Sequence, residues 1–185
     1  MVLNDVLYLV GKYLGDTSLL EEIDGITTSS EGRELITQYR KLLNIVQKRI
    51  ATEWIVLKTK ENIEIKSQKL DFAELDKKYY KLIKVVKDGK FIKFNMLDDG
   101  IELENGPCEI WYQYLPSDVL TSTGEVFDFN GKISERLFAL GIASEYCMLN
   151  GMYDTANYFE EKFINSLNSL RITSLHKTMP KRRWL

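Results

Sequence analysis

The sequence predicts an α+β fold, in which a helical bundle of two helix pairs carries an inserted small antiparallel β meander and an extended C-terminal tail. Apolar residues recur with helical spacing near both ends of the chain, whereas they alternate with polar residues along its middle. Turn-forming pairs such as Asp88-Gly89 divide the alternating region into short segments. Strands grouped between helices are typical of α+β proteins.

Length and composition are those of a globular protein. With 185 residues, 44% of them hydrophobic and 28% charged, the chain fits a single domain with a real core. The two cysteines, Cys108 and Cys147, are far apart and form no CxxC, so we expect small core residues in a reducing compartment. No apolar stretch approaches the roughly 18 residues of a membrane span. The N-terminus lacks a basic segment before its apolar run, which argues against a secretory signal.

Residues 1–53 are predicted to form the N-terminal helices. The first helix covers Leu3 to Leu14 and ends at Gly15, a usual residue just past a helix end. Residues 16–29 show no clear period and are expected to form a loop. Ser30 is a plausible N-cap for a long helix that reaches about Ala51. Its buried line is predicted to be Leu35, Tyr39, Leu42, Val46 and Ile50.

Residues 54–116 are predicted to form the β insertion. At Trp54 the period changes from helical to alternating, so residues 54–57 are expected to begin the first strand. Turns are expected at Asp88-Gly89, at Asp99-Gly100 and at residues 105–107, which gives four to six strands. Pro116 ends the last strand because proline cannot donate to a ladder. A loop over 117–131 follows.

The stretch 131–170 is predicted to form a helical hairpin around which the chain is organised. Its first helix has a wide apolar face and several small residues that allow another backbone to come close. Asn150-Gly151 interrupts the pattern, and Asp154 is expected to cap the second helix. So short a break favours an antiparallel pair. The buried line of the second helix is predicted to be Ala156, Phe159, Phe163, Leu167 and Leu170.

Catalytic patterns are scarce in this sequence. His176 is the single histidine, and no phosphate-binding glycine loop or zinc-ligand spacing is present. The adjacent pair Asp98-Asp99 precedes Gly100 and is interpreted as turn chemistry. We therefore expect no enzyme activity, no cofactor and no metal. A hydrolase built on two scattered carboxylates stays open, because such pairs carry no sequence signature.

Two stretches are candidate interaction sites. In the strand that contains Trp111, Tyr112 and Tyr114, aromatic residues fall on both faces, which fits either a strand buried on both sides or an interface. The C-terminal tail, residues 171–185, carries five basic residues and no acidic one. The net charge of the whole chain is −2, so residues 1–170 carry a net charge of −7. The tail is either a loose end or a docking segment, in which basic residues contact an acidic groove and Trp184 fills a pocket.

The order of elements resembles the head-tail connector (adaptor) proteins of tailed bacteriophages, including the tail tubular A type with a β insertion. The resembling features are the helix that ends at Trp54, the strand block that closes with Tyr112-Gln113-Tyr114-Leu115-Pro116, the helix around residues 140–146 with the following residues 151–156, and Lys181-Arg182-Arg183-Trp184. The resemblance implies a structural virion protein of the neck, assembled in the host cytoplasm. It implies a homo-oligomeric ring, a dodecamer in the virion, between the portal protein and a tail or neck protein, with DNA passing through the lumen. The expected portal-docking residues are Lys177, Met179, Lys181, Arg182, Arg183 and Trp184.

Three functions therefore compete at the level of sequence. The first is this adaptor, which involves neither a membrane nor sequence-specific binding of nucleic acid. The second is a nucleic-acid-binding module that uses the basic tail. The third is a hydrolase with an unrecognised carboxylate site, which would show a defined pocket with perturbed carboxylates.

Overall fold

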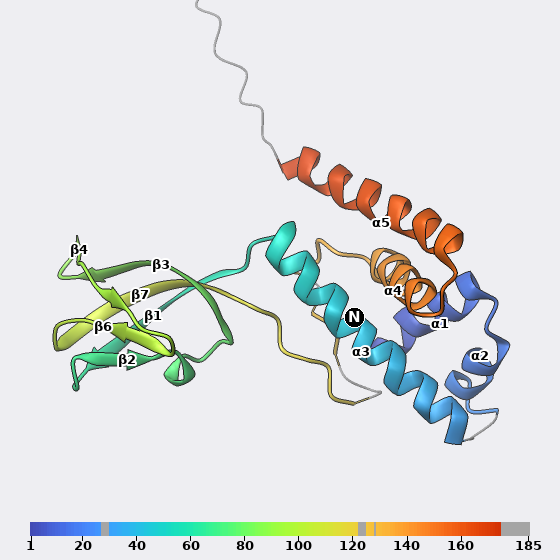
Figure 1. The fold of residues 1–185 in the computed structure, drawn as a ribbon, viewed down its shortest axis with the longest axis horizontal. Coiled ribbons are helices and arrows are strands. Elements are labelled where there is room, and N and C mark those ends of the chain that lie inside the picture. The colour runs from blue at the N-terminus through green and yellow to red at the C-terminus, as the bar shows by residue number, and fades with distance from the viewer. Residues whose placement is uncertain (27–29, 122–124, 128, 175–185) are drawn as a thin grey trace, which may run out of the picture. The chain divides into compact units, whose positions relative to one another are not determined.

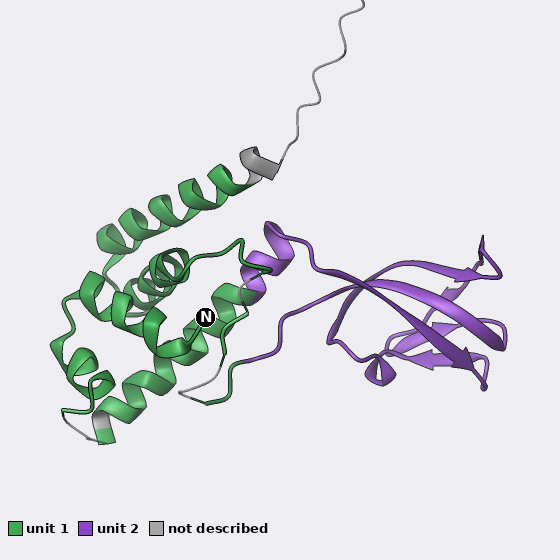
Figure 2. Ribbon diagram, turned by 180° about the vertical axis from the view of Figure 1, so that it is seen from behind, with its two compact units in different colours: residues 1–47, 119–185 green, residues 48–118 purple. Residues whose placement is uncertain are grey.

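A computed structural model describes residues 1–26, 30–121, 125–127 and 129–174. The chain divides into two compact units (Figure 2). Residues 1–47 and 119–185 form one, which we call the helical unit, and Lys48–Asp118 form the other, which we call the β unit. Helices and antiparallel sheets thus occupy separate parts of the chain, and the predicted α+β class is confirmed.

The helices of the described chain are α1 (Leu3–Leu14), α2 (Thr17–Ile23), α3 (Ser30–Glu53), α4 (Glu135–Leu149) and α5 (Tyr153–Ser174). The first helix has the predicted bounds, and Gly15 follows it in the left-handed conformation, at φ 67°. The loop predicted over residues 16–29 is wrong in part, because α2 lies within it. The Asp16 side chain caps α2 by accepting a hydrogen bond from the Leu19 amide. With Leu19 as its only buried residue, this seven-residue helix is too short to show a period.

Helix α4 is the central element of the helical unit (Figure 1). Its residues from Leu137 to Ser144 are all buried, so the helix is covered on every side. A Cβ atom on Gly141 would lie 2.8 Å from Val46 Cγ1 of α3 and 2.9 Å from Phe163 Cε2 of α5. The predicted close approach at small residues is therefore found here, where glycine lets two other helices pack against α4.

The α4–α5 connection follows the predicted break. Gly151 has a φ of 72°, and the line of Ala156, Phe159, Phe163 and Leu167 is buried. Helix α5 begins at Tyr153, so Asp154 lies in its first turn and does not precede the helix as a cap. The helix also continues to Ser174, four residues into the stretch predicted as the C-terminal tail.

The β unit contains two antiparallel sheets. One has the order β1-β7-β3-β4, and the other has the order β2-β6-β5. The predicted meander is wrong in topology, because β7 pairs with both β1 and β3 instead of lying at an edge. Seven strands are present where four to six were expected. They are β1 (Lys58–Ile65), β2 (Lys69–Asp71), β3 (Tyr79–Lys87), β4 (Lys90–Phe91), β5 (Asn95–Met96), β6 (Gly100–Glu102) and β7 (Gly106–Tyr114), with a short 3-10 helix over Phe72–Glu74.

The first strand begins later than predicted. Helix α3 runs to Glu53, and the amides of Trp54 and Ile55 both donate to the Ile50 carbonyl, at 3.0 and 2.8 Å. These bonds end the helix. Residues 54–57 follow it and belong to no strand. The hydrophobic residues after Trp54 therefore form a connection, while the largely polar stretch from Lys58 forms β1.

The two predicted Asp-Gly turns differ. Asp88 and Gly89 have φ angles of 51° and 73°, which fits the expected two-residue turn between β3 and β4. Gly100 belongs to β6, and the turn before it is formed by Asp98 and Asp99. A Cβ atom on Gly100 would lie 2.2 Å from the Leu70 carbonyl oxygen of β2. Glycine is needed there for close strand packing and not for a turn.

The core of the β unit lies between its two sheets. Residues of the four-stranded sheet and residues of the three-stranded sheet belong to one buried cluster. The buried members are Ile65, Leu70, Leu75, Val85, Ile101, Leu103, Cys108, Ile110 and Tyr112.

Candidate interaction surfaces

The predicted portal-docking residues lie outside the described part of the chain. They are Lys177, Met179, Lys181, Arg182, Arg183 and Trp184, and the description ends at Ser174. The candidate residues on β7 are described, and they separate onto two faces.

Tyr112 is a core residue. Its side chain is fully buried, and Tyr114 on the same face packs against the same cluster. The Tyr112 hydroxyl donates to the Glu61 carboxylate of β1 and accepts from the Lys77 amide at 3.2 Å. Burial raises the pKa of Tyr112 above its usual range, and the hydrogen bond to Glu61 raises it further. Of the two predicted interpretations, core strand or interface, the first describes this face of β7.

Trp111 points to the opposite face of β7, where it belongs to a cationic cluster. Its Nε1 donates to Glu109 Oε1 at 2.5 Å, and Lys60 Nζ lies 2.8 Å from Glu109 Oε2. The Lys84 ammonium stands 4.3 Å from the centre of the indole ring, within cation–π range. The hydrogen bond from Lys60, followed by the one from Trp111, lowers the pKa of Glu109. This side of the sheet is half-exposed and polar, as an interaction surface would be.

Two irregularities in β3 gather lysines on this face. The pairing of β3 with β7 shifts between Tyr79 and Lys81 and again between Leu82 and Lys84. Lys81 pairs with Gln113 and Lys84 with Trp111, so both lysines share the outer face. In a regular strand, residues three apart would point to opposite sides. On β1, Lys58 and Lys60 pair with the same two residues of β7. We call Lys58, Lys60, Lys81, Lys84 and Trp111 the lysine face.

A second exposed surface lies at the turn between α4 and α5. Met148, Leu149, Met152 and Tyr153 are between 42% and 66% exposed and surround Gly151 in the sequence. We call these four residues the apolar tip. Contiguous exposed apolar side chains of this kind mark contact sites for other molecules.

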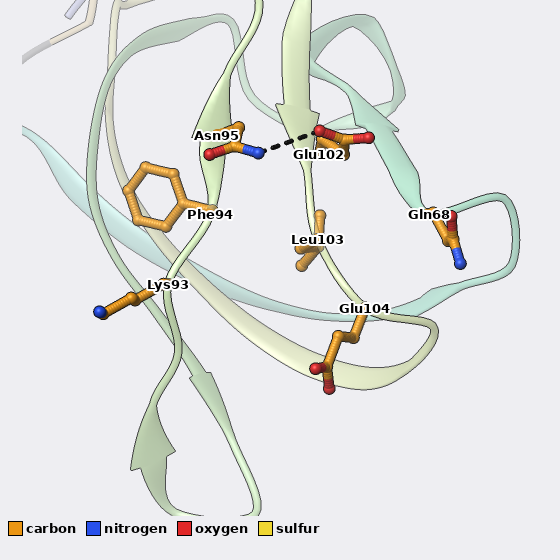
Figure 3. Close-up of a pocket in the computed structure, with 7 residues that line it drawn as sticks. All are labelled: Gln68, Lys93, Phe94, Asn95, Glu102, Leu103 and Glu104. Atoms are coloured by element: carbon orange, nitrogen blue, oxygen red, sulfur yellow. Dashed lines mark hydrogen bonds between the residues drawn. The ribbon is translucent and has the colours of Figure 1, made fainter.

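The pocket drawn in Figure 3 is a polar hollow of about 340 Å³ within the β unit. Asn95 on β5 donates to the Glu102 carboxylate on β6 at 3.1 Å. The Lys93 ammonium is turned away from this pair in Figure 3, so the charged groups do not converge on one point. The lining residues are Gln68, Lys93, Phe94, Asn95, Glu102, Leu103 and Glu104.

Two carboxylates of the described chain, Asp99 and Glu160, have structural partners. Asp99 pairs with Lys69 at 2.9 Å, and this hydrogen bond lowers its pKa. Glu160 accepts a hydrogen bond from the buried Ser144 hydroxyl at 3.1 Å. Within the described residues, no group of three or more histidine, cysteine or acidic side chains is arranged to hold a metal. Cys108 and Cys147 are both free and buried, as predicted, and burial raises the pKa of each thiol.

None of the helices in the described ranges is long and apolar enough to span a bilayer. Comparison with protein-family models and with curated proteins finds no match to this chain.

Proposed function

We propose that this protein is a structural adaptor of a phage virion neck, which forms a ring between the portal and a tail or neck protein. The observation that carries the proposal is the interruption of one helical unit by a separate β unit, residues 48–118. The connector family that the sequence resembles combines helices with an inserted β region in this order. The protein acts in this proposal by binding other proteins, with no reaction of its own.

The exposed surfaces are compatible with such a role. A subunit that sits between several partners needs more than one contact surface. The apolar tip belongs to the helical unit, and the lysine face belongs to the β unit. Apolar and cationic surfaces suit partners of different chemistry.

The experiment deletes residues 177–185 and measures attachment to the portal. The adaptor proposal expects unchanged circular dichroism and thermal unfolding, because the deletion lies beyond α5. It expects loss of portal binding in co-sedimentation with assembled portal rings. A variant that replaces Lys12, Lys41 and Lys132 by glutamine serves as a charge control, since these lysines are exposed and lie in the helical unit. If the truncated protein binds the portal as tightly as the intact protein does, the proposal for the tail is contradicted.

The second candidate function is a nucleic-acid-binding module that uses the tail. The observation that favours it is that residues 171–185 include five basic residues and no acidic one. In this case the intact protein binds duplex DNA with a steep dependence on salt, and the deletion abolishes that binding. The adaptor proposal expects no DNA affinity to be lost with the tail.

A further inference from the structure

We propose that the hairpin of β3 and β4, with the residues that flank it, binds single-stranded nucleic acid without reading its sequence. We call residues 77–93 the lysine hairpin. This site shares Lys81 and Lys84 with the lysine face but does not include the tail, so nucleic-acid binding by the hairpin and portal binding by the tail are tested separately.

The lysine hairpin is strongly cationic. It contains seven lysines and a single acidic residue, Asp88. From Lys78 to Lys93 a lysine occurs at every third position, and the register shift between Leu82 and Lys84 puts Lys81 and Lys84 on one face. The seven are Lys77, Lys78, Lys81, Lys84, Lys87, Lys90 and Lys93.

Few of these charges are neutralised. Lys78 lies 4.0 Å from Asp118, and Lys87 lies 3.6 Å from Glu104. Among the described residues, the other five lysines of the hairpin have no carboxylate within ion-pair distance. Neighbouring lysines repel one another, and a bound polyanion removes this repulsion. Binding also releases the counterions that are condensed on the nucleic-acid phosphates, which favours the complex.

The cationic charge is local to this hairpin. The β unit has 13 basic and 13 acidic residues between Lys48 and Asp118, so its net charge is zero. Residues 1–47 and 119–170 of the helical unit therefore carry the net charge of −7, and residues 171–185 of the same unit carry +5. A phosphate backbone is attracted to the hairpin and repelled by residues 1–47 and 119–170.

Exposed aromatic rings favour single strands over duplexes. Phe91 on β4 is 75% exposed, and Tyr80 on β3 is 45% exposed. The Lys84 ammonium lies 5.2 Å from the centre of the Phe91 ring, so a cation and an exposed aromatic ring are neighbours. Unpaired bases stack on such rings while lysines contact the backbone, whereas duplex bases are already stacked on one another.

The test compares two triple variants of the full chain that change the net charge equally. Lys81, Lys90 and Lys93 are replaced by glutamine in one, and Lys12, Lys41 and Lys132 are replaced in the other. All six lysines are exposed, and the tail is present in both proteins, so its contribution cancels. Binding of a labelled oligothymidine of about 16 nucleotides is measured by fluorescence anisotropy across a salt series. Circular dichroism confirms that both variants are folded.

The proposal expects the hairpin variant to reduce the slope of log K against log [salt] by about 2, since each lost contact to a single strand contributes about 0.7. The helical-unit variant should keep the slope of the unaltered protein. Phe91→Ala should weaken oligothymidine binding about tenfold, while Tyr158→Ala, which removes an exposed aromatic ring of the helical unit, leaves it unchanged. Equal slopes for the two triple variants would overturn the site. Duplex binding as tight as single-strand binding, with no effect of Phe91→Ala, would overturn the single-strand assignment.

Discussion

Truncation of Phe163 should strongly destabilise the helical unit. The ring is fully buried on α5 and packs against α4 at Gly141. Phe→Ala substitutions in cores cost about 3–5 kcal/mol, through lost burial and the cavity that remains. Gly141 has no side chain that could move into the space, so we expect Phe163→Ala to fall in the upper half of that range. Tyr158→Ala on the same helix removes a ring that is 54% exposed and should cost about 0.5 kcal/mol or less.

The assay is urea unfolding followed by two signals. Far-ultraviolet circular dichroism at the helical minimum reports mainly on the helical unit, which holds most of the helices. In a Trp184→Phe background the two remaining tryptophans, Trp54 and Trp111, lie in the β unit, so the fluorescence follows that unit. The reasoning predicts a large fall in the midpoint of the helical signal for Phe163→Ala. A loss below about 1 kcal/mol would mean that the α4–α5 packing described here is wrong.

Three further predictions concern the β unit. Gly100→Ala should lower the midpoint of the tryptophan transition strongly, because its Cβ would meet the Leu70 carbonyl and strand backbones must move. Insertion of one glycine between Asp88 and Gly89 should change the same midpoint only slightly, since this turn is exposed and has nothing within 4 Å of its glycine Cβ position. Tyr112→Phe should cost about 1–3 kcal/mol at neutral pH through lost hydrogen bonds. The folded-state pKa of Tyr112 is raised, so its stabilisation is full below the ordinary tyrosine pKa of about 10 and is lost as the pH rises above that value. The unaltered protein should therefore lose stability above pH 10 more steeply than the Phe variant, measured by urea unfolding at several pH values.

The sequence predicted the long helices well because their apolar residues repeat over several turns. Helix α1 has the expected bounds, and the buried line of α5 is as predicted as far as Leu167. Helix α2 escaped prediction because it has too few residues for a period. The first strand was expected, but it begins at Lys58 and not at Trp54, because the polar residues of β1 form a strand through pairing with β7. The order of strands within a sheet depends on contacts between distant segments, which local patterns do not contain.

The candidate sites were predictable in part. Alternation along β7 separated Trp111 from Tyr112 and Tyr114, but it could not decide which face is buried. The lysine hairpin was missed, although its three-residue lysine spacing is visible in the sequence. A regular strand would scatter Lys81 and Lys84 onto opposite faces, and only the register shifts in β3 bring them together. Such shifts depend on pairing with β7 and leave no clear local signal.

The measurement that tests the central proposal most directly is the protein content of purified virions of the phage that, under this proposal, encodes the chain. Quantitative mass spectrometry would compare peptides of this protein with peptides of the portal. The adaptor proposal predicts that the chain is present in virions. Its copy number should equal that of the portal subunits or stand in a simple ratio to it. Abundant protein in infected cells together with its absence from purified virions would contradict the proposal.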